Sequence, residues 1–251
     1  MKKKVIAIIG AGGRIGSSLV HKLSAEQHEL LLVDINYKKI KYLKKINKLS
    51  NVEIFCGDIT KTSVINKFLK FGIKKFKRID SAVYCSYAKS KKFGSPLNNI
   101  DEKFLKEDLY KQLGAVILFS IKIIDLFLKF KKGNLILLSS IMGVKAPKFD
   151  HYLNTKMVSP IEYSAVKSGI ISITSYLSKY YKNNNIRVNC ISPGGIKDNQ
   201  PKNFQIKYKK SCNNKGLLDP KDVSSTISFL LSSDSEFING QNIIIDDGWS
   251  L

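Results

Sequence analysis

Cysteine, histidine and long apolar runs are all scarce in this chain of 251 residues. Its four cysteines, Cys56, Cys85, Cys190 and Cys212, are widely scattered and form no CxxC pair. We therefore expect reduced thiols and no disulfide framework. The three histidines are isolated, and none has a second ligand at metal-binding spacing, so we expect no metal site.

No apolar stretch approaches the length of a transmembrane helix. The opening MKKKVIAIIGAGG is basic, but its apolar run extends only from Val5 to Ile9. That run is too short for the core of a signal peptide or for a bilayer span. We expect a cytoplasmic protein with no membrane partner.

Acidic residues are few: 20 Asp and Glu face 42 Lys and Arg, which gives a net charge of +22. The lysines are spread over the whole chain, and no RNA- or DNA-binding motif accompanies them. We interpret the charge as compositional and expect no nucleic-acid partner. A phosphorylated or nucleotide-linked substrate remains compatible with it.

Short runs rich in Val, Ile and Leu recur along the chain and are apolar on both faces, as in a buried parallel sheet. Stretches long enough for a helix separate them. This rhythm predicts a single α/β domain over residues 1–251, a Rossmann-type doubly wound sheet of seven parallel strands with helices on both faces. The expected strands are 5–10, 29–34, 52–58, 79–85, 134–140, 186–192 and 241–247.

Two stretches interrupt this rhythm, at about 145–160 and about 198–216. Each follows the carboxyl end of an expected strand, where loops shape the ligand crevice of open α/β sheets. We interpret the first as an inserted substrate loop and the second as a variable region; surface decoration is the alternative.

The first strand leads into the glycine-rich turn G10-A-G-G-R-I-G16. Glycines here allow a tight turn and close approach to a pyrophosphate, and the following helix offers free N–H groups. The turn predicts a dinucleotide site, with a purely structural turn as the alternative. Its expected contacts are Gly10, Gly12, Gly13, Arg14, Ile15 and Gly16.

Asp34 closes the second strand, 18 positions after Gly16. An acid at this distance hydrogen-bonds the ribose hydroxyls and repels a 2′-phosphate, which favours NAD over NADP. Lys38 and Lys39 lie just beyond and could soften that discrimination. Asp58, after the third strand, is placed to reach the adenine, or is an ordinary surface acid.

Tyr163 and Lys167 stand four apart in IEYSAVKSG, on one face of an expected helix. Three other pairs share the spacing, so the spacing alone decides nothing. A free tyrosine has a pKa of about 10, and a neighbouring ammonium favours the phenolate. We expect Lys167 to lower the pKa of Tyr163, which could then exchange a proton with a substrate oxygen.

In its setting this pair resembles the active site of the short-chain dehydrogenase/reductase superfamily. LLSSIMG contains Ser140, EYSAVK contains Tyr163 and Lys167, and ISPGG contains Pro193 and Gly194, in the family's order after the glycine turn. The resemblance covers essentially the whole chain and implies an NAD(P)-dependent oxidoreductase.

By this resemblance, Ser140 hydrogen-bonds the reacting oxygen, Lys167 also holds the nicotinamide ribose, and the backbone of Ile196 binds the carboxamide. Ser139 is the alternative to Ser140. The resemblance also places further residues against the cofactor, namely Ile59, Cys85, Ser86, Tyr163, Pro193 and Gly194.

The chain departs from the family pattern at several points. Tyr84-Cys85-Ser86-Tyr87 replaces Asn-Asn-Ala-Gly, and Gln112 stands where an asparagine completes the proton relay. The gap between Ser140 and Tyr163 is 163 − 140 = 23 positions, about ten more than usual. We expect the excess to form a substrate wall. The candidate substrate contacts are Tyr87, Tyr152, Asn154 and Lys156.

A closer resemblance is to the flagellin-modification and surface-glycan oxidoreductases, carried by VYCSYAKSKKFG, APKFDHYLNTKMVSPIEYSAVKSG and NCISPGGIKDNQP. It implies a sugar-derived substrate, phosphorylated or not, in surface-glycan, nonulosonic or amino-sugar synthesis. The alternatives are an NAD-retaining epimerase or dehydratase, and a weakly catalytic cofactor-binding partner subunit. Enoyl reductases of this fold space their tyrosine and lysine more widely. Family members usually form homodimers or homotetramers through long helices.

Overall fold

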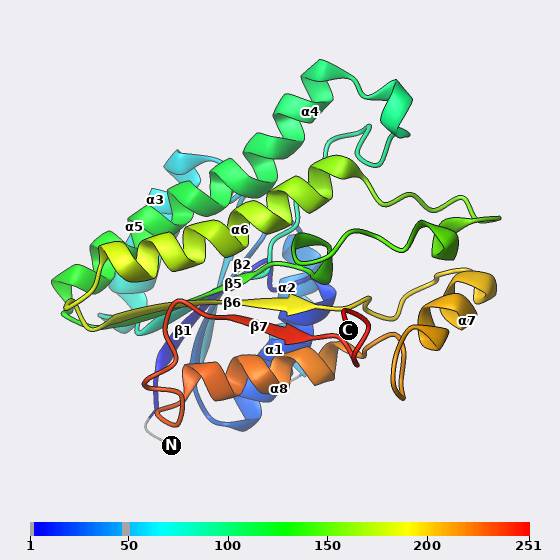
Figure 1. Ribbon diagram of the computed structural model, residues 1–251. Helices are drawn as coiled ribbons and strands as arrows, with labels where there is room; N and C mark the ends of the chain where they lie inside the picture. Colours follow the sequence, from blue (N-terminus) through cyan, green and yellow to red (C-terminus); the bar gives the residue numbers. More distant parts are fainter. Residues whose placement is uncertain (1–2, 47–50) are drawn as a thin grey trace.

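The computed structural model describes residues 3–46 and 51–251. A seven-stranded sheet lies at its centre, all parallel, in the spatial order β3-β2-β1-β4-β5-β6-β7 (Figure 1). This confirms the predicted doubly wound Rossmann-type fold. The strands are β1 (Val5–Ile9), β2 (Glu29–Asp34), β3 (Val52–Cys56), β4 (Ser81–Tyr84), β5 (Gly133–Leu138), β6 (Ile186–Pro193) and β7 (Asn242–Ile245).

Helices cover both faces of the sheet. In Figure 1 the long helices of the upper layer cross above the strands, and α1 and α8 lie below them. The α-helices are α1 (Arg14–Ala25), α2 (Tyr37–Ile46), α3 (Thr62–Phe76), α4 (Glu102–Leu109), α5 (Ala115–Lys129), α6 (Ile161–Tyr180), α7 (Lys202–Lys210) and α8 (Pro220–Leu231). Short helical turns complete the described chain: η1 (Leu97–Asn99), η2 (Tyr110–Gly114), η3 (Ile141–Gly143) and η4 (Phe149–Tyr152).

Alternate residues of the central strands pack into different layers. Val5, Ala7 and Ile9 of β1 join the core beneath α3, α5 and α6, whereas Ile6 and Ile8 join the core shared with α1 and α8. Side chains alternate across a strand, so an uninterrupted apolar strand fills both cores at once. This explains why the strand runs could be located from composition alone.

The two interrupting stretches are partly helical. η3 and η4 lie in the long connection between β5 and α6, and the second stretch contains α7. A third apolar cluster joins them, with Ile141, Phe204, Tyr208 and Trp249 buried in it. Figure 1 shows α7 beyond the carboxyl ends of β6 and β7, so both stretches border the same edge of the sheet.

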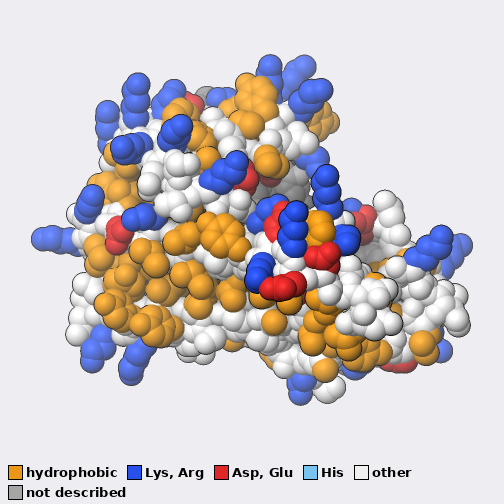
Figure 2. Space-filling view, turned by 90° about the horizontal axis from the view of Figure 1, so that it is seen from above, with side chains coloured by type: hydrophobic (Ala, Val, Ile, Leu, Met, Phe, Trp, Pro, Cys, Tyr) orange, Lys and Arg blue, Asp and Glu red, His pale blue; other side chains and the backbone are white. Residues whose placement is uncertain are grey.

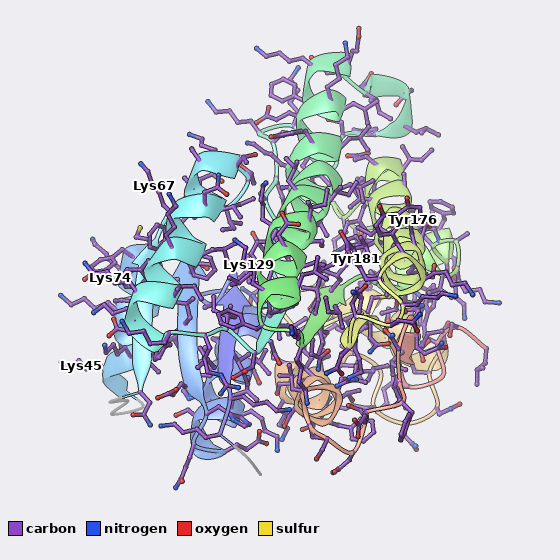
Figure 3. All side chains as sticks on the ribbon, turned by 90° about the vertical axis from the view of Figure 1, so that its left-hand side faces the viewer. Lys45, Lys67, Lys74, Lys129, Tyr176 and Tyr181 are labelled. Carbon is purple, nitrogen blue, oxygen red and sulfur yellow. The ribbon has the colours of Figure 1, made fainter. Side chains whose placement is uncertain are left out.

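Lysines project from many elements rather than from one. Figure 3 labels Lys45 on α2 and Lys67 and Lys74 on α3 toward the left edge of the view, and Lys129 on α5 near its centre. Among the described residues, no helix combines the length and apolar character needed to span a membrane. Over the same residues, no group of three or more His, Cys, Asp or Glu side chains could hold a metal ion.

Candidate active site

The glycine turn joins β1 to α1 and keeps the helix close to the strand end. Gly10 has a φ of +78°, a conformation that side chains rarely adopt. A Cβ atom at position 16 would lie 2.3 Å from the carbonyl oxygen of Gly10, so only glycine permits this contact. Because α1 begins at Arg14, its free N–H groups border the space beside the turn.

That space is a cavity of about 460 Å³ at the carboxyl edge of the sheet, where the strand order reverses between β1 and β4. Tyr87, expected at the substrate, also lines it. Tyr163, Lys167, Pro193 and Gly194 do not line it. The expected cofactor contacts that do are Gly10, Gly12, Gly13, Arg14, Ile15, Gly16, Asp34, Asp58, Ile59, Cys85, Ser86 and Ile196.

Asp34 is held rigidly beside the turn. Its Oδ2 accepts a hydrogen bond from the backbone N–H of Gly12 at 2.9 Å, and its Oδ1 accepts one from Asn36 at 2.8 Å. The carboxylate thus places negative charge in the cavity wall, where a 2′-phosphate would be repelled. Lys39 lines the same wall and brings one positive charge near it.

Asp58 lies in the same cavity and caps the turn after β3. Its Oδ1 accepts hydrogen bonds from the backbone N–H of Thr60 at 3.1 Å and from the Thr60 hydroxyl at 2.7 Å. The side chain is therefore oriented by local structure and is available at the cavity rim.

Ser140 and Tyr163 meet above the end of β5. The Ser140 Oγ accepts a hydrogen bond from the Met142 N–H at 3.2 Å and is hydrogen-bonded to the Tyr163 hydroxyl. The hydroxyl of Ser139 instead donates to the carbonyl oxygen of Lys167 at 2.7 Å. Of the two candidate serines, the structure therefore brings Ser140 to Tyr163.

Lys167 lies beneath both aromatic rings of this site. Its ammonium donates to the carbonyl oxygen of Leu138 at 2.9 Å and lies 5.4 Å from the centre of the Tyr163 ring. It is 5.6 Å from the centre of the Tyr87 ring. The helical spacing read from the sequence thus brings phenol and ammonium together at the edge of the sheet.

The expected direction of the Tyr163 pKa is wrong. Burial raises the pKa of Tyr163, and the hydrogen bond from Ser140 offsets this only in part. Burial also lowers the pKa of Lys167 to about 8. Desolvation disfavours the charged form of both groups and is the largest cause of each shift. Tyr163 is therefore protonated at neutral pH.

Two aromatic residues that precede α4 pack on the Tyr163 ring. Tyr87 meets it edge-on at 5.5 Å between ring centres, and Phe93 at 6.4 Å. The ammonium of Lys89 lies 4.8 Å from the centre of the Tyr87 ring. Tyr87 stands where the resemblance places a glycine, so this wall departs from the common family pattern.

Gln112 lies on a π-helical turn, η2, between α4 and α5. Its side-chain N–H donates to Asp108 Oδ1 at 3.4 Å, while its own carbonyl oxygen is buried without a described partner. Asp108 also accepts from the backbone N–H of Ser90 at 2.7 Å and from its hydroxyl at 2.6 Å. Asp108 therefore fixes the loop that carries Tyr87 and Phe93.

Asp108 and Phe93 were not predicted from the sequence. The only local signal for Asp108 was its position four residues before Gln112, which puts both on one face of a helix. Its partner Ser90 lies 18 positions away and could not be found by spacing.

The Pro193-Gly194-Gly195 turn is tied to the last strand and to α7. Gly194 donates its N–H to Ile245 at 2.7 Å, and Gly195 donates to the hydroxyl of Tyr208 at 2.6 Å. Ile196 follows, pairs with Leu218 as an isolated bridge and lines the cofactor-sized cavity.

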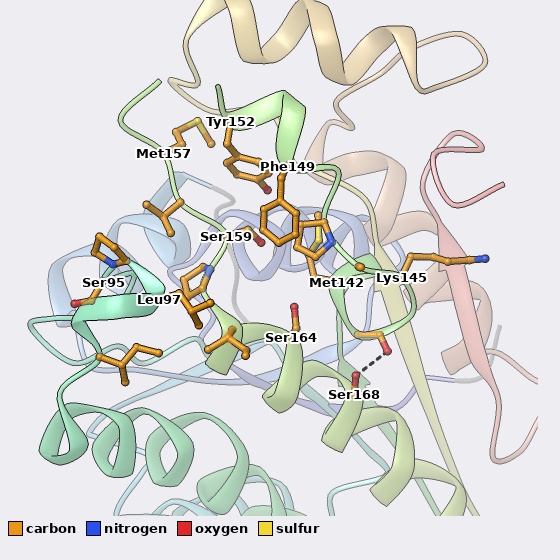
Figure 4. A pocket seen from close by; sticks show the side chains of 18 of the residues that line it. Ser95, Leu97, Met142, Lys145, Phe149, Tyr152, Met157, Ser159, Ser164 and Ser168 are labelled. Atoms are coloured by element: carbon orange, nitrogen blue, oxygen red, sulfur yellow. Dashed lines mark hydrogen bonds between the residues drawn. The ribbon is translucent and has the colours of Figure 1, made fainter. Parts of the chain in front are cut away.

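The inserted segment borders a second cavity, of about 650 Å³, shown in Figure 4. Tyr152 lines it, with the residues around Lys145 and Met157. Asn154 and Lys156 are not among its lining residues; Asn154 adopts a φ of +62° in the turn that follows η4.

Comparison with known proteins adds three observations. A family model described as Enoyl-(Acyl carrier protein) reductase matches residues 10–250. Post-translational flagellin modification protein A of Campylobacter coli is 40% identical over 255 residues, covering 100% of both chains. A short-chain dehydrogenase from Leptospira borgpetersenii, solved with bound NAD+, superposes with a TM-score of 0.90 at 29% identity, covering 100% of this chain and 94% of that one.

A further relative shows how widely activities vary at lower identity. The 7alpha-hydroxysteroid dehydrogenase of Bacteroides fragilis is 24% identical over 257 residues, covering 100% of this chain and 95% of its own. The matches therefore all extend over almost the whole chain, whereas the names of the matched proteins refer to different activities.

Proposed function

The chain belongs to the short-chain dehydrogenase/reductase family, and we propose that it transfers hydride between a nicotinamide cofactor and a sugar-like hydroxyl or ketone. The observation that supports this most is the hydrogen-bonded pair of Ser140 and Tyr163, with Lys167 beneath the phenol ring. These groups stand at the carboxyl edge of the sheet, where doubly wound folds bind their ligands.

NAD is the cofactor that the site favours. The close approach of Gly16 to the Gly10 carbonyl keeps α1 near the turn, and the N-terminus of α1 suits a pyrophosphate. The Asp34 carboxylate suits the ribose hydroxyls of NAD rather than a 2′-phosphate. The Leptospira relative was solved with NAD+, in agreement with this choice. Asp58, Ile59, Cys85 and Ser86 would complete the adenine and ribose walls.

When bound, the nicotinamide supplies or accepts the hydride. The chain's own residues handle the proton. Tyr163, protonated because burial raises its pKa, can donate its proton to a carbonyl oxygen that Ser140 also hydrogen-bonds. The Lys167 ammonium stabilises the phenolate left behind. Asp108, to which Gln112 is hydrogen-bonded, holds the loop that carries Tyr87 and Phe93 against this site.

The sugar-like substrate is supported by the flagellin-modification relative, which matches over the full length of both chains. The family model carries the name of an enoyl reductase, but the spacing of four between Tyr163 and Lys167 differs from such enzymes. We place the reaction in surface-glycan or amino-sugar synthesis in the cytoplasm. An epimerase or dehydratase that retains NAD is the second candidate, and a weakly catalytic cofactor-binding subunit is the third, because Gln112 alters the relay position.

We also propose a homodimer or homotetramer built through α5 and α6. Ile117, Ile121, Tyr176 and Tyr180 expose apolar surface on these helices, between 36% and 67% of each side chain. Figure 2, which views the molecule from above, shows a broad hydrophobic area on this face. Tyr176 lies on α6 at its outer surface in Figure 3.

The test is a panel of UDP-, GDP- and CMP-linked sugars and sugar phosphates, with NAD+ or NADH followed at 340 nm. A Tyr163→Phe variant serves as the control, and we expect it to bind NADH but to lose roughly 10²–10⁴-fold in turnover. Tightly bound NAD with substrate conversion but no net change in NADH would favour the epimerase or dehydratase. Turnover unaffected by Tyr163→Phe would refute the proposed chemistry.

A further inference from the structure

The second cavity differs in character from the cofactor-sized one. It lies between the η1 loop, the segment after Ser140 and the first turns of α6, as Figure 4 shows. Its volume of about 650 Å³ is within the usual range of small-molecule sites. The apolar side chains that dominate its walls include Leu97, Ile100, Met142, Phe149, Met157 and Ile161.

The cavity adjoins the two catalytic hydroxyls. Met142 and Gly143 in its wall follow Ser140 in η3, and Ser164 follows Tyr163 in α6. Tyr152, another wall residue, lies close enough to raise the pKa of Tyr163 by charge interaction. Ser140 and Tyr163 are not themselves lining residues, so a molecule held by them would reach this space with the part that lies beyond its reacting group.

Most polar groups of the wall are already used within the protein. The Ser168 hydroxyl donates to Gly143 at 2.9 Å, and the Ser95 hydroxyl donates to Lys92 at 2.8 Å. Tyr152 and Ser159 are hydrogen-bonded to each other. Among the described residues, only the Ser164 hydroxyl of the wall shows no such bond, so a bound molecule would find few partners.

Charge is nearly absent from the wall. Lys145 is its single charged residue, and in Figure 4 its ammonium points away from the cavity. The wall contains no carboxylate, side-chain amide or guanidinium group. A ring with several free hydroxyls would lose its hydrogen bonds to water here and regain few.

We propose that the substrate places an uncharged apolar substituent, an alkyl or acyl group, in this cavity. The inference rests on the proposed function and narrows its substrate class: the ring that bears the reacting hydroxyl or ketone is poor in hydroxyls on the side facing η1 and the inserted segment. The nucleotide or phosphate of an activated sugar, if present, lies outside this cavity.

The test compares ring ketones that share one reacting group. We would measure NADH oxidation with cyclohexanone, 4-methylcyclohexanone and 4-propylcyclohexanone. The comparison compound is myo-2-inosose, a ring ketone in which all the remaining ring carbons carry a hydroxyl. Added methylenes in an apolar pocket are each worth roughly 10-fold or more. We expect kcat/KM to rise at least about tenfold from cyclohexanone to the propyl derivative, and to be lowest for the inosose.

A variant links the preference to the cavity. Replacing two partly exposed wall residues, Leu97→Gln with Phe149→Gln, should lower the ratio of kcat/KM for the propyl ketone over cyclohexanone several-fold. The matched control is Phe237→Gln, an almost fully exposed aromatic residue that lines neither cavity. It should leave the ratio unchanged.

Binding separates failure of this inference from failure of the proposed function. Calorimetric titration of the Tyr163→Phe variant with NADH should show tighter binding of 4-propylcyclohexanone than of the inosose. If the wild type reduces none of these ketones but this binding order holds, the proposed hydride transfer fails, and only the apolar preference of the cavity stands. If ketones are reduced with no apolar preference, or the inosose is preferred, the inference is overturned while the oxidoreductase activity stands.

Discussion

The ammonium of Lys167 lies 5.4 Å from the centre of the Tyr163 ring, and both side chains are largely removed from water. Each group is therefore pushed toward its neutral form, the phenol by a raised pKa and the amine by a lowered one. Keeping the charged forms of these groups away from water costs free energy. The cost arises where a bound cofactor and substrate would supply new polar partners.

This arrangement predicts that Lys167 destabilises the cofactor-free protein at neutral pH. With a folded-state pKa of about 8 against 10.5, the unfolded chain binds more protons between these values. The free energy of unfolding contributed by Lys167 therefore rises as the pH rises from 8 to 10.5. Below pH 8 the full penalty is present, at most about 3 kcal/mol.

Lys167→Met keeps the length of the side chain and removes its charge. We expect the variant to be more stable than the wild type at pH 7, to lose that advantage toward pH 10, and to lose hydride transfer. Urea unfolding of the cofactor-free proteins at these pH values measures the difference. A variant that is less stable at pH 7 would show that the hydrogen bond to Leu138 outweighs desolvation.

Asp34 predicts the cofactor preference. Its carboxylate is fixed by Gly12 and Asn36, so it cannot easily turn away from a 2′-phosphate. We expect Asp34→Ser to raise kcat/KM for NADPH relative to NADH by at least about tenfold, because like-charge repulsion disappears while Lys39 remains. Steady-state kinetics with both cofactors measures this ratio. An unchanged ratio would exclude Asp34 as the discriminating residue; Asp58→Ser, in the same cavity but expected at the adenine, is the control.

Much of this molecule could be predicted from sequence because its pattern is local. The strands are apolar on both faces, so composition located them, and Tyr163 with Lys167 was recognisable from its setting after Ser140. The raised pKa of Tyr163 was missed, since it depends on burial in the folded protein, where Tyr87 and Phe93, distant in sequence, pack on its ring.

Long-range contacts explain the other omissions. Asp108 reaches Ser90 across 18 positions, and His151 reaches Ser211 across 60. The apolar walls of the second cavity come from separate segments whose meeting no spacing rule describes. Residue type predicted a substrate wall in the inserted segment, but not which of its side chains line the cavity.

His151 joins the inserted segment to α7. It is buried against Phe204, Tyr208 and Trp249, and its Nε2 lies 3.0 Å from the Ser211 hydroxyl. Burial lowers its pKa below 6.5. Its contribution to stability is therefore fully present above pH 6.5 and is lost as the pH falls through 6.5 toward the lower folded-state pKa.

We expect His151→Phe to remove this part of the pH dependence. The free energy of unfolding of the wild type should fall more steeply than that of the variant between about pH 7 and pH 5. Chemical unfolding at both pH values measures it. His28 is buried with a lowered pKa as well, so His28→Gln should also reduce the slope; equal slopes for wild type and His151→Phe would contradict the assignment.

The exposed rings of Tyr176 and Tyr180 on α6 stack at 5.9 Å between ring centres, and Ile121 on α5 is exposed as well. A stable interface needs about 800 Å² from each partner, and we expect α5 and α6 to form its centre. We expect Ile121→Glu combined with Tyr176→Glu to convert the oligomer to a 28.3 kDa monomer, because paired copies would bury like charges. Light scattering after size-exclusion chromatography measures the mass.

The control Phe237→Glu changes an exposed aromatic residue outside these helices and should leave the oligomer intact. Dissociation in both variants, or in neither, would place the interface elsewhere.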